Sequence, residues 1–186
     1  MLKRIKALSV SALSLLLLSG CVLHPVKRTF YEPDSADGHV RGGHCRYLRT
    51  HSAVWRKVAG AQWEISFVDV PPGGAPRETL DLNLSISAPA DAVVFDPHRL
   101  RLDVAGTSES LAPTFIDQQP DGPRDREGVV VQRYTISFPH PAGIAIDITI
   151  DILPGALAIG GAPQNLAPFH FHRTTKSDLY VESGDC

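Results

Sequence analysis

Two histidines separated by one residue, His170 and His172, are the side chains whose type and spacing best suit chemistry. In a β-strand both imidazoles would project from one face, about 7 Å apart, while Phe169 and Phe171 would point into the core. Imidazole nitrogens at that spacing can supply two ligands of one Cu(II) or Zn(II) ion. The alternative is a pair of polar residues on the solvent side of a strand. Because the sequence places no third ligand beside them, we treat His170 and His172 as candidate binding residues and predict no bound metal or cofactor.

The sequence lacks the motifs of common enzymes. It has no G-x-S-x-G nucleophile elbow and no glycine-rich loop that leads into a helix to bind phosphate. Asp147 and Asp151 share the polar face of one predicted strand, where they solubilise the protein. The acidic residues within 106–128 lack the alternate-residue spacing of an EF-hand calcium loop. We therefore predict no catalytic residue and no enzymatic activity.

Residues 1–20 have the order of a secretory signal peptide. Cations at Lys3, Arg4 and Lys6 precede an apolar run, and small residues follow it. The apolar run is shorter than the about 20 residues that a transmembrane helix needs. We expect this segment to be removed rather than to form part of the fold.

The residues that end this segment, Leu18-Ser19-Gly20-Cys21, resemble the lipobox of bacterial lipoproteins. The resemblance covers the signal region alone. It implies that the thiol of Cys21 is lipidated and that cleavage occurs just before it. Residue 22 is Val rather than Asp, which in that family implies the outer membrane, on its periplasmic side. The alternative is an ordinary structural cysteine after an ordinary cleavage site.

Two further cysteines, Cys45 and Cys186, remain in the mature chain. The periplasm oxidises thiols, so we predict that they form a disulfide bond. It would close a loop of about 140 residues and stabilise the fold by on the order of 5 kcal/mol. Free thiols or a metal-binding pair are the alternatives, although neither cysteine has the spacing of a zinc site.

Composition narrows the class of partner. The chain has 18 basic and 20 acidic residues, and 43% of its residues are hydrophobic. The hydrophobic fraction excludes a disordered chain, and the charge balance argues against a nucleic-acid-binding protein. Cations concentrate in residues 22–60 and anions in residues 61–186. An acidic body suits a basic protein partner, because complementary charge raises the association rate.

The chain divides into the signal peptide, a tether and one domain. Residues 21–43 are rich in Pro, Gly and Asp without apolar periodicity, which predicts a lipidated N-terminus and flexible tether. Residues 44–186 form the predicted domain. Within it, residues 106–128 predict a long loop that is either functional or disordered.

Apolar and polar residues alternate through most of the domain, which is typical of half-buried strands. The segments are 63–67, 79–87, 100–104, 134–138 and 144–152, with Gly and Pro clusters between them. Residues 47–58 fit either a strand or a short helix. Strands with one apolar face pack as two sheets. We predict an all-β fold: an antiparallel β-sandwich of about seven to nine strands, immunoglobulin-like in general architecture.

The function that these features favour is a non-enzymatic lipoprotein that binds another protein in the periplasm. Secretion-system components, envelope-assembly accessories, and immunity proteins or inhibitors resemble this layout. The alternative is a periplasmic Cu or Zn binding protein that uses His170 and His172.

Overall fold

The structure is a computed structural model that describes residues 22–42, 50–68, 78–89, 93–119, 128–141 and 146–182. Cys21, Cys45 and Cys186 lie outside these ranges, so their predicted lipidation and disulfide bond stay predictions. The described residues form an all-β fold in which every strand pairing is antiparallel. None of their helices is long and apolar enough to cross a membrane.

Six strands form the largest sheet. Their order is β2, β3, β4, β5, β10, β9. In the same order they span His39–Gly42, His51–Val58, Ala61–Phe67, Thr79–Pro89, Val129–Pro139 and Phe115–Gln119.

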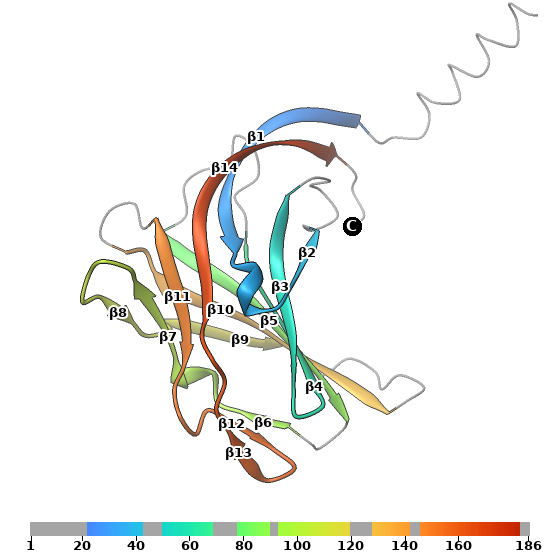
Figure 1. The fold of residues 1–186 in the computed structure, drawn as a ribbon, viewed down its shortest axis with the longest axis vertical. Coiled ribbons are helices and arrows are strands. Elements are labelled where there is room, and N and C mark those ends of the chain that lie inside the picture. The colour runs from blue at the N-terminus through green and yellow to red at the C-terminus, as the bar shows by residue number, and fades with distance from the viewer. Residues whose placement is uncertain are drawn as a thin grey trace, which may run out of the picture.

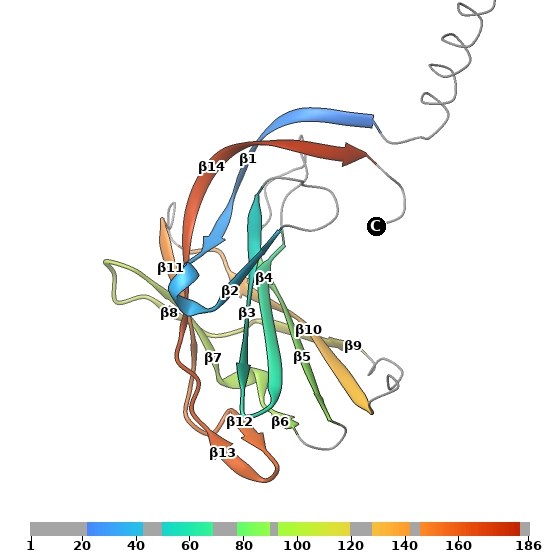
Figure 2. The ribbon, with the colours of Figure 1, turned by 45° about the vertical axis from the view of Figure 1, so that its right-hand side comes forward.

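Five strands form the second sheet, in the order β1, β14, β11, β7, β8. They span Val22–Pro33, Phe169–Glu182, Asp147–Ile152, Leu100–Val104 and Ser110–Leu111. A small third sheet has the order β13, β12, β6, with strands Ala162–Gln164, Leu157–Ile159 and Val93–Phe95. Two short 3-10 helices, η1 (Ser35–Asp37) and η2 (Pro97–Arg99), complete the described elements. In Figures 1 and 2, β1 and β14 run side by side and curve away from the other strands.

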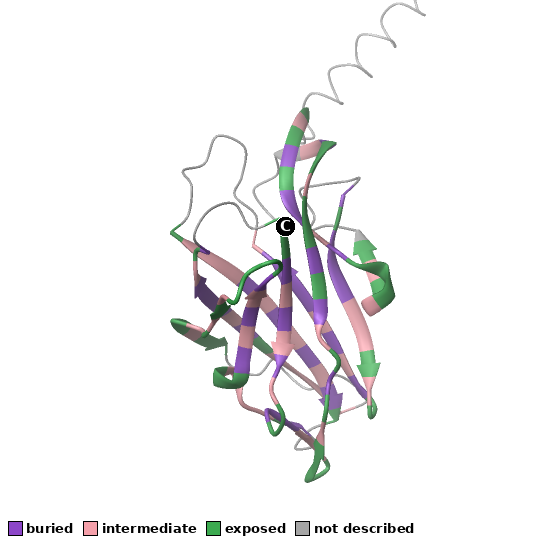
Figure 3. Cartoon of the chain, turned by 60° about the vertical axis from the view of Figure 1, so that its left-hand side comes forward, coloured by how far each residue is buried: buried purple, intermediate pink, exposed green. Residues whose placement is uncertain are grey.

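The predicted alternation is confirmed along most strands. Leu82, Leu84 and Ile86 are at most 1% exposed, whereas their neighbours in β5 are partly exposed. Figure 3 shows this alternation as buried bands between more exposed ones. Ile146 is an exception, at 65% exposed, because β11 begins only at the next residue.

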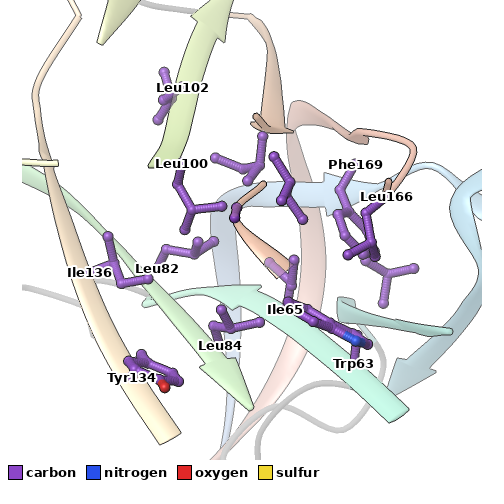
Figure 4. Packing of buried hydrophobic residues seen from close by; sticks show 14 of the residues in the cluster. Trp63, Ile65, Leu82, Leu84, Leu100, Leu102, Tyr134, Ile136, Leu166 and Phe169 are labelled. Atoms are coloured by element: carbon purple, nitrogen blue, oxygen red, sulfur yellow. The ribbon is translucent and has the colours of Figure 1, made fainter. Parts of the chain in front are cut away.

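The two larger sheets share one hydrophobic core. Leu100 and Phe169 from the five-stranded sheet meet Trp63 and Leu84 from the six-stranded sheet (Figure 4). Phe67 and Phe171 contribute an edge-to-face ring pair across it, with centroids 5.0 Å apart. Burial of this shared apolar core supplies the main driving force that holds the sheets together.

The predicted strand number is too low, because the described residues form fourteen strands. The additional ones include β6, β8, β12 and β13, each of two or three residues. Such short strands carry too little alternation to be recognised in a sequence. Part of the predicted long loop, Phe115–Gln119, is the edge strand β9, and the ambiguous segment contains the strand β3 rather than a helix.

The predicted tether is also corrected, because most of it is folded. Val22–Pro33 is β1, which pairs with β14 from Val22 opposite Glu182 to Pro33 opposite Phe171. The N–H of Asp34 donates to the carbonyl of His170 at 2.9 Å. In an antiparallel pair the backbone groups alternate in direction, so the N–H and C=O groups of even-numbered residues in β1 point toward β14, and those of odd-numbered residues point away from it. Pro25 and Pro33 are odd-numbered. β1 tolerates both because neither removes a hydrogen bond to β14.

A buried polar network fastens the β1/β14 pair to the start of β3. Arg28, Thr50 and Asp178 are each at most 3% exposed. The Arg28 guanidinium donates to the Thr50 hydroxyl, which donates to Asp178 Oδ2 at 2.5 Å. The backbone N–H of Thr50 donates to the same oxygen at 3.0 Å. The network therefore joins three segments that are far apart in the sequence.

Candidate functional site

β14 holds the two candidate histidines on the outside of the five-stranded sheet. Phe169 and Phe171 are buried in the core, whereas the side chains of His170 and His172 are about half exposed. This confirms the orientation expected from the sequence. The neighbouring strand β11 places Thr149 opposite His170 and Asp147 opposite His172.

Asp37, at the end of η1, fixes the orientation of His170. The Nδ1 atom of His170 lies 3.1 Å from each carboxylate oxygen of Asp37, and the backbone N–H of His170 donates to the same carboxylate. Two acceptors on one side of the residue restrict its ring, so Nε2 is the nitrogen left for a ligand.

The turn that carries Asp37 is itself well defined. Asp34 caps η1, since its carboxylate accepts the N–H of Ala36 at 2.9 Å. Gly38 follows η1 and passes close to β3, where a Cβ atom would lie 2.5 Å from the carbonyl oxygen of Trp55. Only a residue without Cβ permits this approach. The sequence Asp34 to Gly38 therefore positions the carboxylate that holds His170.

His172 lies farther from its carboxylate partner than His170 does. Its Nδ1 atom is 3.8 Å from Asp147 Oδ1, and both side chains are more than half exposed. Such a pair is easily separated by solvent, so His172 can turn toward a ligand.

His170, His172 and Asp147 line a groove with a volume of about 720 Å³. Its walls come from the end of β1, from η1 and β2, and from β11 and β14; Ala105, after β7, completes it. Glu32, Asp34 and Asp147 supply carboxylates, and none of the described residues that line the groove is Lys or Arg. The Nζ atom of Lys176 lies 2.6 Å from the Glu32 carboxylate and forms an ion pair with it. Asp34 and Asp147 are therefore the groove carboxylates that are not paired with this lysine.

The described residues contain no group of three or more His, Cys, Asp or Glu side chains arranged to hold a metal ion. Among the other histidines with described positions, His39 stacks on Trp55 at a centroid distance of 4.6 Å. Among the described residues, no hydroxyl or thiol hydrogen-bonds to His170, whose Nδ1 atom pairs with Asp37. The geometry of the groove suits binding.

Sequence reasoning identified the histidines, but it missed Asp37, the partner of His170, and the groove carboxylates of Glu32 and Asp34, and it gave Asp147 only a solubilising role. Glu32, Asp34 and Asp37 lie in the stretch that we predicted as a tether. The available signal was the pair Asp34 and Asp37 followed by Gly38, a pattern typical of a capped turn.

Comparison with known proteins adds no relative: no family model matches the chain, and no curated protein or solved structure shows significant similarity to it.

Proposed function

We propose that this protein is a non-enzymatic, lipid-anchored protein of the outer membrane that faces the periplasm and captures a basic segment of a protein partner in its acidic groove. The single observation that supports this best is the lining of the groove, which has the carboxylates of Asp34 and Asp147 beside the lysine-paired Glu32 and, among its described residues, no Lys or Arg. A Lys- or Arg-rich segment is complementary to that lining, which favours fast association and correct orientation. Immunity proteins, inhibitors and secretion or envelope accessories are the classes that such capture would serve.

The fold that we propose is a β-sandwich, immunoglobulin-like in general architecture, formed by the two larger sheets. Its support is the common core, in which Phe67 of β4 contacts Phe171 of β14. Stacked sheets that share one layer of side chains are rigid, and grooves at their edges keep their shape when a partner binds.

Anchoring at Cys21 would have a direct geometric consequence. β1 already starts at Val22, so no flexible residues separate the proposed lipid from the fold. The groove begins at the opposite end of β1, where Glu32 and Pro33 line it. Twelve residues of strand measure about 40 Å along the curved path of β1, so β1 would separate the groove from the lipid.

The proposal is tested with a short lysine-rich peptide as the probe and isothermal titration calorimetry as the measurement. The double variant Asp34→Asn/Asp147→Asn removes two carboxylates from the groove and retains an N-cap at position 34. We expect the dissociation constant for the peptide to rise about tenfold, because each lost charge pair contributes up to about 1 kcal/mol.

The matched control is Asp96→Asn/Asp117→Asn. It removes two carboxylates elsewhere, one of them also a helix N-cap. Equal weakening by both double variants would show that net charge, rather than the groove, attracts the peptide. That outcome would refute the assignment of the groove.

A second candidate function is Cu(II) or Zn(II) binding through His170 and His172. It is favoured by the carboxylates at both Nδ1 atoms, since metal-bound histidines commonly present their second nitrogen to a carboxylate. We expect titration with either metal to shift the NMR resonances of both imidazoles, and the double variant His170→Ala/His172→Ala to lose uptake. Unchanged uptake in the double variant eliminates this function.

A further inference from the structure

We propose that the outer face of the six-stranded sheet holds a second binding site, for a sugar that carries a carboxylate group. The site is a hollow of about 260 Å³ over β4, β5, β10 and β9. It shares no lining residue with the acidic groove. The proposal therefore stands independently of the proposed function.

Strand register explains how the hollow forms. Glu64, Ser85, Arg133 and Gln119 are consecutive cross-strand neighbours in one row of the sheet. Ser66, Asn83 and Thr135 form the adjacent row. The small serine side chains form the bottom of the hollow, and the longer side chains at the ends of the two rows form its walls.

The bottom of the hollow contains the hydroxyl group of Ser66, which has no partner among the residues that the structure describes. Ser66 is only 5% exposed and lines the hollow, yet its side chain hydrogen-bonds to no residue that the structure describes. Asn83 beside it accepts the Thr135 hydroxyl at 3.3 Å through Oδ1, which leaves its Nδ2 group as a donor. Both groups are suited to the hydroxyls of a sugar ring.

Arg133 supplies the charge that selects a carboxylate. It is exposed, its cross-strand neighbours Ser85 and Gln119 are neutral, and it forms no ion pair with any described residue. Glu64, at the other end of the row, is already engaged by Arg41 at 3.3 Å. A planar guanidinium without a partner binds a carboxylate through two parallel hydrogen bonds.

The composition and size of the hollow define the ligand class. One guanidinium beside several hydroxyl and amide groups matches a molecule that has one carboxylate and several hydroxyls. The volume lies just below the range of about 300–1,000 Å³ for sites of drug-sized molecules. A single sugar acid, free or as one residue of a glycan, has this chemistry.

The test is NMR titration of the isotope-labelled protein with D-glucuronate, D-glucose and a polygalacturonate chain. We expect D-glucuronate to shift the amide resonances of Ser66, Ser85 and Arg133, with D-glucose binding at least tenfold more weakly. Tighter binding of polygalacturonate than of D-glucuronate would assign the site to glycan chains, and the reverse would assign it to free sugar acids.

Two variants locate the binding. Arg133→Gln is expected to weaken D-glucuronate binding about tenfold or more, and Ser66→Ala about fivefold. Lys57→Gln is the control, because Lys57 is an exposed cation on the same face whose position lies outside the hollow. No binding of either acid, equal binding of D-glucose, or equal loss in the Lys57 and Arg133 variants would overturn the proposal.

Discussion

Asp178→Ala is expected to lower the free energy of unfolding by about 3–5 kcal/mol. Asp178 is the carboxylate of the buried network that includes Thr50 and Arg28. Its removal leaves the Arg28 guanidinium and the Thr50 N–H in a site with little access to water. Neither group can recover its hydration there, which is why breaking such a network from one side is so destabilising.

Chemical denaturation of the purified domain measures this change. Asp178→Asn keeps an oxygen that can accept from Thr50 but removes the charge, so we expect a smaller loss. Asp117→Ala, on the exposed strand β9, is the control and should change stability by less than about 0.5 kcal/mol. If Asp178→Ala and Asp117→Ala behaved alike, the network would not fasten the β1/β14 pair as described.

Loss of the predicted disulfide bond is expected to have an effect of similar size. Cys45 and Cys186 lie outside the described residues, but Cys45 precedes Thr50 by five residues and Cys186 follows Asp178 by eight. Thr50 and Asp178 are hydrogen-bonded to each other, so the described ends of the two segments are brought together. We expect the double variant Cys45→Ser/Cys186→Ser to lose on the order of 5 kcal/mol, since it frees a loop of about 140 residues in the unfolded chain.

Thiol labelling and mass spectrometry of the unreduced protein provide the direct readout. We expect no reactive thiol at positions 45 and 186, and a cross-linked peptide that contains both. A reducing agent should destabilise the native protein and leave the double variant unchanged. Free thiols at both positions, or a cross-link from Cys186 to Cys21, would contradict the pairing.

The sequence predicted those parts of the fold whose signal is local. Leu82, Leu84 and Ile86 alternate with polar residues, and they are buried as expected. The orientation of His170 followed from the same period of two. In each case the backbone geometry of a strand determines the face without knowledge of its neighbours.

Long-range contacts were not predictable in this way. β1 pairs with a strand at the other end of the chain, and its Lys27 and Thr29 side chains are polar and exposed, so β1 lacks a continuous apolar row. The partner of His170 is Asp37, 133 positions away. No local pattern encodes a contact of that separation, because it depends on how the two sheets are assembled.

The most direct test of the central claim is photo-crosslinking in the native cell envelope, from a photoreactive residue placed at Thr149 in the groove. The account predicts that the protein and its crosslinked product are found in the outer-membrane fraction. It also predicts that Cys21→Ser releases the protein from that fraction, and that Asp34→Asn/Asp147→Asn removes the product while Asp96→Asn/Asp117→Asn does not. A product that persists in the groove variant, or a protein whose membrane association does not depend on Cys21, would contradict the account.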